Sequence, residues 1–489
     1  MAATSAGTGF ERLRASVQAE LLARAPDQIG RLRWSREQIE AAQRDGLRAL
    51  LARAIGHSPF HRRRLGGIDP SRFELAGLSS LPVMTKAEMM QDLDAVFTDR
   101  RLSRGLVERA LAATVAEPIP ILGEYTAVAS GGCSGQRGLF VFDREALVGG
   151  FSSLLRWQMA RMLAPGGPPP RGLPSVMVGA ASAVHVTGSA PAWTAGEQMP
   201  FRVIPVPVTL PVAEIVERLN SLQPSVLYGY ASMLARLAAE QRAGRLRIAP
   251  MTMTTTSETL TPQMRAAAAE AFGAPIVDIF GSSEGLIGTS APDDEVLVFN
   301  SDLCIAELVD AKNQPVPPGV PSAKVLLTNL YNLTQPLIRY ELTDSFVGQP
   351  YAADHGHLRA QVRGRADEVL SYAGVDIHPH VVRSVLVTSP EILDYRVRQT
   401  PAGMDVEVLA VVHVDSARLA GRLAKALAKA GLHHPAITVR IVDHLERDPE
   451  TGKLRRFVPL RAATTTRRSR GQALIEDTGT CRRAPGPTP

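Results

Sequence analysis

The chain has 489 residues, 45% apolar and 21% charged, a globular composition with enough length for several domains of ~100–200 residues each. Its three scattered cysteines exclude a disulfide framework and a cysteine-based zinc site, and no apolar run is long enough to span a membrane. Most of the net charge of +6 lies from Arg461 onward, where six arginines face only Glu476 and Asp477, a surplus of +4. We therefore expect no nucleic-acid or membrane partner, and the absence of an apolar leader predicts a cytoplasmic location.

The predicted elements begin with helices over residues 1–115. Ser35 is suited to cap a helix, and Glu37 lies in its expected first turn. Apolar residues then recur with helical spacing, and the Ser58–Pro59 pair is expected to end this helix. We assign residues 1–115 to the helical N-terminal part of a large domain.

Residues 116–365 show another pattern, in which short apolar runs alternate with amphipathic helical stretches. This alternation is typical of an α/β sheet domain. The clearest strand candidates are residues 175–180, 201–208, 225–230, 274–280 and 324–330. Residues 366–460 contain two strand-like runs around one Ala/Leu-rich helix, which predicts a small α+β domain. Residues 461–489 have the composition of a disordered tail.

One segment matches a hydrolase signature. Residues 281–285 read GSSEG, which fits G-x-S-x-G and would make Ser283 a nucleophile. That chemistry needs a helix directly after the serine, whereas Gly288 and Pro292 oppose a helix there. The hydrolase interpretation is therefore kept only as a minor alternative.

Four further segments could carry chemistry. The glycine-rich loop ASGGCSGQRG (129–138) frees its backbone N–H groups to bind an anion. In PLIRYELTDSF (336–346), an exposed Asp344 could bind ribose hydroxyls, with Arg339 and Tyr340 packed beside it. GRADEVLSYAGVDIHP lies at the expected domain boundary, and the turn in DPETGKLRRF would present Lys453.

Together with GSSEG, these segments follow the motif order of the adenylate-forming superfamily, which contains acyl-CoA synthetases and adenylation domains. From about residue 37 to residue 460 the chain resembles this superfamily, and most of all its phenylacetate-CoA ligase branch. The segments most similar to that branch are SPFHRRRL, LPVMTKAEM, PSVLYGYASMLARLA, SETLTPQMRAAAAEAFGAPIVDIFGSSEG and GRADEVLSYAGVDIHP. The resemblance implies a large N-terminal α/β domain of adenylate-forming type and a small, mobile C-terminal α+β domain.

The resemblance also implies a role for each matching residue. Lys453, Glu284 and Ser283 would be catalytic, with Glu284 holding Mg²⁺ and Ser283 contacting the α-phosphate of ATP. Asp367 would be the hinge between the domains. The implied nucleotide-binding residues are Ser130, Gly131, Gly132, Ser134 and Gly135 in the phosphate loop, Ser257, Glu258, Asp278 and Phe280 around the adenine, and Asp344 and Arg365 at the ribose.

An enzyme of this kind joins a carboxylate to AMP, which is a better leaving group than oxide, and then transfers the acyl group to coenzyme A. The implied cofactors are ATP, Mg²⁺ and coenzyme A, and the expected substrate is an aryl or arylacetyl acid. Alternatives are transfer to a carrier protein or an amine, and a degenerate nucleotide-binding module. A homodimer and the identity of the acid stay open. Candidates for lining the acid's pocket are Tyr125, His185, Tyr228 and Tyr230.

The chain departs from the family pattern at several positions. Gln136 and Arg137 replace the usual lysine and proline of the phosphate loop. The segment YAADHGHLRAQ contains His355 and His357 but no cysteine, so we expect no structural zinc there. Ala373 stands where the family has an arginine near the thiol tunnel, which bears on the coenzyme A assignment.

Overall fold

The computed structural model describes residues 2–130, 137–164, 173–180, 182–196, 199, 202–208, 210–257, 260, 262–362, 370–377, 379–389, 391–410, 413–443, 445 and 457–460. The phosphate-loop residues Gly131, Gly132, Ser134 and Gly135, and also Glu258, Arg365, Asp367 and Lys453, lie outside these ranges. No helix within them is long and apolar enough to cross a membrane.

The expected helical start is confirmed. Ser35 caps α2 in a reciprocal capping box with Gln38, and α2 ends at His57 as predicted. Ser58 then caps a further helix, α3, which has Pro59 at its first position. The elements of this region are α1 (Ala2–Gly30), η1 (Arg31–Arg33), α2 (Arg36–His57), α3 (Pro59–Leu65), η2 (Pro70–Arg72), η3 (Leu75–Ser80), α4 (Lys86–Gln91), α5 (Leu93–Val96) and α6 (Arg104–Ala113).

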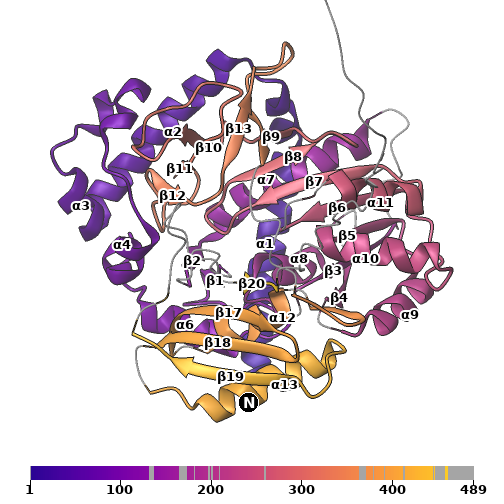
Figure 1. Ribbon diagram of the computed structural model, residues 1–489. Coiled ribbons are helices and arrows are strands. Elements are labelled where there is room, and N and C mark those ends of the chain that lie inside the picture. Colours follow the sequence, from indigo (N-terminus) through magenta and orange to yellow (C-terminus); the bar gives the residue numbers. More distant parts are fainter. Residues whose placement is uncertain are drawn as a thin grey trace, which may run out of the picture.

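A nine-stranded mixed sheet forms the centre of the molecule (Figure 1). Its strand order is β13-β14-β9-β8-β7-β6-β5-β3-β4. The strands from β4 to β7 are parallel, and those from β7 to β13 are antiparallel. The bounds are β3 (Pro174–Gly179), β4 (Arg202–Pro207), β5 (Val226–Tyr230), β6 (Thr252–Thr256), β7 (Ile276–Gly281), β8 (Ile287–Ser290), β9 (Leu297–Phe299), β13 (Phe346–Gln349) and β14 (Arg359–Val362).

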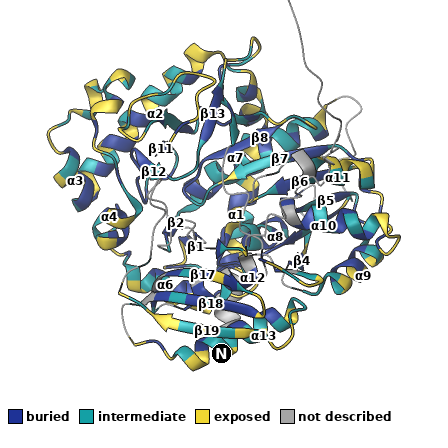
Figure 2. Cartoon of the chain, viewed as in Figure 1, coloured by how far each residue is buried: buried dark blue, intermediate teal, exposed yellow. Residues whose placement is uncertain are grey.

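Helices cover both faces of this sheet. Val176 and Val178 of β3 pack with α9 (Val212–Leu222), α10 (Ala231–Arg242) and α11 (Pro262–Phe272) in one apolar core. Met177, which points to the opposite face, packs against the layer of α1 and α7 (Arg144–Leu163). α8 (Val186–Thr194) contacts β3 and β4. Figure 2 shows that the central strands are mostly buried, as expected for a sheet between two helical layers.

Two smaller sheets flank the large one. β1 (Thr126–Ala129) and β2 (Leu139–Phe142) form a hairpin around the glycine-rich loop. β10 (Cys304–Val309), β11 (Lys324–Asn329) and β12 (Tyr340–Leu342) form an antiparallel sheet. Each of the strand candidates proposed from the sequence is a strand here, namely β3, β4, β5, β7 and β11.

The C-terminal part contains the expected helix between two strands, together with further elements. The expected elements are β18 (Gly403–Ala410), α13 (Ser416–Lys429) and β19 (Ala436–Ile441). The sheet has four strands, in the order β19-β18-β17-β20, because β17 (Ile392–Thr400) and β20 (Phe457–Val458) join it. The hairpin of β15 (Leu370–Tyr372) and β16 (Val375–Ile377) and the helix α12 (Pro379–Val387) complete this part.

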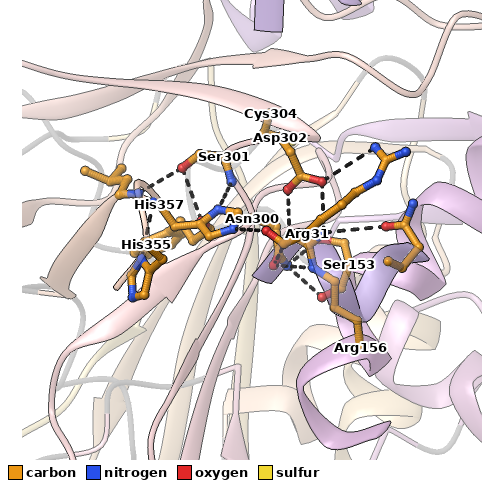
Figure 3. A network of polar contacts seen from close by, with 12 residues as sticks. Arg31, Ser153, Arg156, Asn300, Ser301, Asp302, Cys304, His355 and His357 are labelled. Atoms are coloured by element: carbon orange, nitrogen blue, oxygen red, sulfur yellow. Dashed lines mark hydrogen bonds and ion pairs between the residues drawn. The ribbon is translucent and has the colours of Figure 1, made fainter. Parts of the chain in front are cut away.

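A buried polar network fastens the N-terminal helices to the large sheet (Figure 3). Arg156 of α7 is 1% exposed and donates from both terminal nitrogens to Asp302, at 2.6 and 2.9 Å. Arg156 also donates to Asn300, whose amide donates to Ser153 at 2.7 Å. The network therefore neutralises its buried arginine and pairs the amide of Asn300.

His357 extends the same network toward the N-terminus. Its Nδ1 accepts from the backbone N–H of Ser301 at 3.2 Å, so its Nε2 carries the proton and donates to the carbonyl of Arg31 at 2.9 Å. The ring is fully buried, and burial lowers the pKa of His357 to about 4. The imidazole is therefore neutral in the folded protein at pH 7.

His357 should make stability fall as the pH is lowered. The unfolded histidine takes up a proton near pH 6.5, whereas the buried ring does so only near pH 4, so the loss begins below pH 6.5. It amounts to roughly 2 kcal/mol by pH 5. Urea unfolding at pH 7 and pH 5 should show a smaller pH difference in His357→Gln than in the wild type. The control His433→Gln, at an exposed histidine, should keep the wild-type difference in unfolding free energy between the two pH values. If His357→Gln keeps it as well, His357 is not the cause of the pH dependence.

Candidate active site

The GSSEG segment is a tight turn between β7 and β8. The backbone N–H of Ser282 donates to Leu286, and that of Gly285 donates back to Ser282, both at 3.0 Å. Gly285 has φ +106°, and a Cβ there would lie 2.2 Å from the amide nitrogen of Asn329. The turn leads directly into an antiparallel strand, so the helix that a hydrolase nucleophile requires is absent from this described segment. The hydrolase alternative for Ser283 is therefore wrong.

Three side chains contact the backbone of this turn. They come from Cys304 of β10, Asn329 of β11 and Tyr331, just after β11. The amide of Asn329 donates to the carbonyl of Glu284 at 2.9 Å. The hydroxyl of Tyr331 donates to the carbonyl of Gly285 at 3.1 Å, and the thiol of Cys304 lies 3.4 Å from the same oxygen. These contacts fix the backbone at Glu284, so its carboxylate has a defined position.

The carboxylate of Glu284 is buried beside a lysine that the sequence analysis did not select. The ammonium of Lys86 lies 3.6 Å from Oε1 of Glu284 and donates to the hydroxyl of Ser130 at 3.4 Å. Glu284 is only 6% exposed. The sequence contains one indication of Lys86, because only six of the 54 basic residues are lysines and Lys86 is one of them.

The position of Lys86 follows from how α4 begins. Met84 pairs with β12, since its N–H donates to the carbonyl of Arg339 at 3.0 Å and its carbonyl accepts from Glu341 at 2.9 Å. Thr85 then caps α4 in a capping box with Glu88. Lys86, the first residue of the helix, is thereby brought to the turn.

Tyr340 of β12 is a further neighbour of Glu284. Its side chain is fully buried, and burial together with the neighbouring Glu284 carboxylate raises the pKa of Tyr340 well above its usual value. The phenol therefore stays protonated, and the neighbours of the Glu284 carboxylate include an ammonium and a neutral hydroxyl.

Ser130 closes the base of the glycine-rich loop. Its N–H donates to the carbonyl of Gly138 at 2.9 Å, and the N–H of Gly138 donates to its hydroxyl at 3.0 Å. Since Lys86 contacts both Ser130 and Glu284, the end of β1 and the GSSEG turn converge on one cation. The anion-binding role of the loop stays a prediction.

Phe280 and the Asp344 segment are also brought together. The ring of Phe280 meets Phe346 edge-on, with centroids 5.0 Å apart, and Asp344 lies half-buried two residues before Phe346. Ser257 stands at the exposed end of β6 with φ +67°, a left-handed conformation unusual for serine. The ends of β6 and β7 and the β12–β13 connection thus carry three of the expected nucleotide-binding residues.

Asp278 and Arg339 form side-chain contacts that the sequence analysis did not predict. The carboxylate of Asp278 accepts from the hydroxyl of Thr255 within the sheet, and burial raises the pKa of Asp278 to about 6. Its place beside the adenine stays a prediction. The expectation that Arg339 packs beside Asp344 is wrong, because Arg339 is buried in a two-pronged ion pair with Glu307 at 3.0 and 3.1 Å.

The four pocket candidates have different surroundings. The hydroxyl of Tyr125 donates to Asp99 at 2.6 Å, while the residue is buried in the apolar core, and its part in the pocket stays a prediction. Nδ1 of His185 lies 3.2 Å from the carbonyl of Ala129. The hydroxyl of Tyr230 meets Thr187 of α8 at 3.1 Å, and burial raises the pKa of Tyr228 to about 12.

The segment with His355 and His357 belongs to the buried polar network described above. Within the described part of the chain, no group of three or more His, Cys, Asp and Glu residues could hold a metal ion. Ala373 is exposed in the turn between β15 and β16, next to Gly374 with φ +81°.

Comparison with solved structures identifies the fold as that of adenylate-forming enzymes. The structure of a 2-hydroxyisobutyryl-CoA ligase, in complex with 2-HIB-AMP and CoA, superimposes with a TM-score of 0.56 at 18% identity, covering 86% of this chain and 90% of that one. The fold class expected from the sequence is thus confirmed.

The sequence similarity is to phenylacetate-CoA ligases. The enzyme of Thermus thermophilus is 25% identical over 375 residues, which is 74% of this chain and 78% of the relative. That of Aromatoleum evansii is 28% identical over 140 residues, or 28% of this chain and 32% of the relative. No family model matches the chain. The resemblance drawn from the motifs is confirmed, and both relatives are named ligases.

The GSSEG turn should tolerate a methyl group at one glycine and not at the other. Gly285→Ala should lower the free energy of unfolding by about 2–4 kcal/mol, because the left-handed backbone and the contact with Asn329 both oppose a Cβ. Gly281→Ala is the matched control, since nothing lies within 4 Å of a Cβ there. Denaturant unfolding of both variants measures the contrast, and equal stabilities would contradict the described turn.

Proposed function

We propose that the protein activates a carboxylic acid with ATP, forming an acyl-adenylate and pyrophosphate, and then transfers the acyl group to coenzyme A. The observation that carries the proposal is the burial of Glu284, in a turn held by β10, β11 and Tyr331, beside the ammonium of Lys86. The similarity to phenylacetate-CoA ligases supports an aryl or arylacetyl acid as the substrate.

The chemistry requires cations because both reactants are anionic. The substrate carboxylate must attack the α-phosphate of ATP, so positive charge has to lie where the two anions meet. Lys86 supplies one such charge, already held between Ser130 and Glu284. Ser283, half-buried in the same turn, offers a hydroxyl donor to the α-phosphate. Lys453, from the C-terminal part of the chain, is the second proposed cation.

Glu284 fits the role of a magnesium ligand. Mg²⁺ in nucleotide sites is held by one or two carboxylates together with the substrate's phosphates and water. Glu284 is the buried carboxylate at this turn, and its backbone is fixed by Asn329. The ion would neutralise charge on the phosphates. The protein's own part is to hold Glu284 still and to balance its charge with Lys86 when the metal is absent.

The acceptor of the acyl group belongs to the second half-reaction. A site at which a second domain can change its position allows one group to leave and a thiol to enter, and Asp367 would be the hinge. Ala373 removes a positive charge from the expected thiol approach. A carrier-protein thiol or an amine is therefore the alternative acceptor, which adding each acceptor to the preformed adenylate would distinguish.

Adenylation should depend on both members of the Lys86–Glu284 pair. With a suitable acid, ATP–pyrophosphate exchange should require Mg²⁺ and fall by about 10²–10³ in Glu284→Gln and in Lys86→Met, because each variant removes a preorganised charge. Lys312→Met, at an exposed lysine, is the matched control and should keep full exchange. If folded Glu284→Gln keeps wild-type pyrophosphate exchange, Glu284 is not a magnesium ligand.

Lys453 should be needed for one half-reaction only. An ammonium between carboxylate and α-phosphate helps while the adenylate forms, whereas thiol attack on the adenylate breaks that contact. Lys453→Ala should therefore lose about 10²–10³ in adenylation and still convert supplied acyl-AMP to the thioester. Single-turnover assays of each half-reaction give the answer, and equal losses in both would make Lys453 a general binding or structural residue.

A further inference from the structure

Three amide side chains are buried in residues 329–335, a segment that begins at the last residue of β11. Asn329 and Gln335 have no exposed surface, and Asn332 is 2% exposed. An amide has both donors and acceptors, so burying it is costly unless these groups are paired. The partners of the three amides therefore show what the segment holds together.

Two of these amides occupy the outer edge of β2. The side chain of Gln335 accepts from the N–H of Val141 at 2.8 Å and donates to the carbonyl of Leu139 at 2.9 Å. The side chain of Asn332 donates to the carbonyl of Val141 at 2.9 Å. β2 pairs with β1 along its other edge. The two amides thus bind the backbone groups that a third strand would use.

Pairing by side chains specifies one position for β2. Backbone groups repeat along a strand, whereas the amides of Asn332 and Gln335 fit these particular groups of β2 only once. Thr334 adds a contact at the end of β2, because its hydroxyl donates to Asp143 at 2.5 Å and Asp143 caps α7. The β1–β2 hairpin is therefore fixed relative to the 329–335 segment.

The same segment reaches the GSSEG turn through Asn329. The amide of Asn329 donates to the carbonyl of Glu284 at 2.9 Å, and its oxygen accepts from the N–H of Asn332 at 3.0 Å. The side-chain oxygen of Asn332 accepts in turn from the N–H of Gln335 at 3.1 Å. Hydrogen bonds therefore connect the turn, the three amides and β2 without a break.

Gln335 also contacts the helix that carries Lys86. Its amide nitrogen lies 3.5 Å from the sulfur of Met89, which is three residues after Lys86 in α4. β1 ends directly before Ser130, whose hydroxyl accepts from Lys86. Gln335 thus contacts β2 and α4 directly and is connected to the Glu284 turn through the other two amides.

We propose, on the basis of the proposed function, that Gln335 and Asn332 are positioning residues for MgATP. They set the separation between the β1–β2 hairpin, which ends at Ser130, and the turn that carries Glu284. Ser130 and Glu284 are the groups proposed to meet the phosphates and the magnesium ion. A displacement of about 1 Å in such a site can cost on the order of 10² in rate, so ATP binding and turnover depend on the two amides.

The test measures MgATP binding by isothermal titration calorimetry, and ATP–pyrophosphate exchange with phenylacetate and with benzoate. Gln335→Met keeps the length of the side chain and removes both hydrogen bonds to β2. The Kd for MgATP and the KM for ATP should rise about 10- to 100-fold, with the KM for the acid unchanged within about twofold. Asn332→Leu should act in the same direction.

Gln241→Met is the matched control. The side chain of Gln241, on α10, accepts from the N–H of Ile248 at 3.3 Å and donates to its carbonyl at 2.9 Å, so it makes the same two kinds of bond. Ile248 precedes β6, whereas Ser257 follows β6 on the proposed nucleotide side. The control should lower the melting temperature and leave the Kd for MgATP unchanged. A loss of stability alone is thereby separated from a loss of positioning.

Gln335→Glu tests the role of the two hydrogen bonds directly. Burial raises the pKa of a carboxyl group, and the protonated acid offers one donor and one acceptor, as the backbone groups of Leu139 and Val141 require. Compared with the wild type at the same pH, the Kd of this variant for MgATP should be raised at pH 8 and return toward the wild-type value at pH 6. Gln335→Met should show no such recovery.

The outcomes separate this inference from the proposed function. If the wild type does not bind MgATP, the proposed function fails and the inference with it. If the wild type binds MgATP and folded Gln335→Met and Asn332→Leu keep its Kd, the inference alone is overturned. An equal rise of KM for ATP and for the acid, or an equal weakening in Gln241→Met, would also overturn it. Thermal unfolding verifies that each variant is folded, and Asn332→Leu carries the same test if Gln335→Met does not fold.

Discussion

The contact between Lys86 and Glu284 is the interaction on which the rest of the site depends. A carboxylate as buried as Glu284 is stable only beside a compensating charge. That charge is the ammonium of Lys86, the first residue of the short helix α4. The helix is in place because Met84, two residues before Lys86, pairs with β12. The same cation reaches Ser130, so the loop hairpin, the turn after β7 and the N-terminal helices are joined through one ammonium group. None of these parts would make a site alone.

Paired arginines give this arrangement its rigidity. Arg156 joins α7 to the segment after β9, and Arg339, directly before β12, joins β10 and the carbonyls of Ser79 and Leu81. Breaking either pair would leave a charge without a partner in the interior, which costs several kcal/mol. Segments far apart in the chain are thereby held at fixed distances from one another. The residues proposed to bind ATP and the acid lie on these segments, so their spacing is fixed as well.

The sequence predicts those parts that local pattern controls. Ser35 caps its helix and the five apolar runs are strands, because propensity and alternation are local properties. The GSSEG turn could be located because β7 is strongly apolar and glycines follow it. Lys86 could not be assigned, since its contact with Glu284 depends on how a helix docks on a distant strand. β17 was missed because charged residues alternate along it, and Arg339 was misplaced because sequence adjacency to Asp344 does not give side-chain direction.

The edge strand β4 limits how this molecule can associate. β4 contains Pro205 and Pro207, two residues of the same parity, and it pairs with β3 on one side only. Proline has no N–H to donate, so the outer edge of the sheet lacks two of the donors that an added strand would need. At the other edge, Pro321 bridges to Val347 of β13 and covers part of that strand. The large sheet is thus protected from growing by strand addition, during folding as well as in the native state. A homodimer of this chain would have to pack helices or loops together rather than continue the sheet.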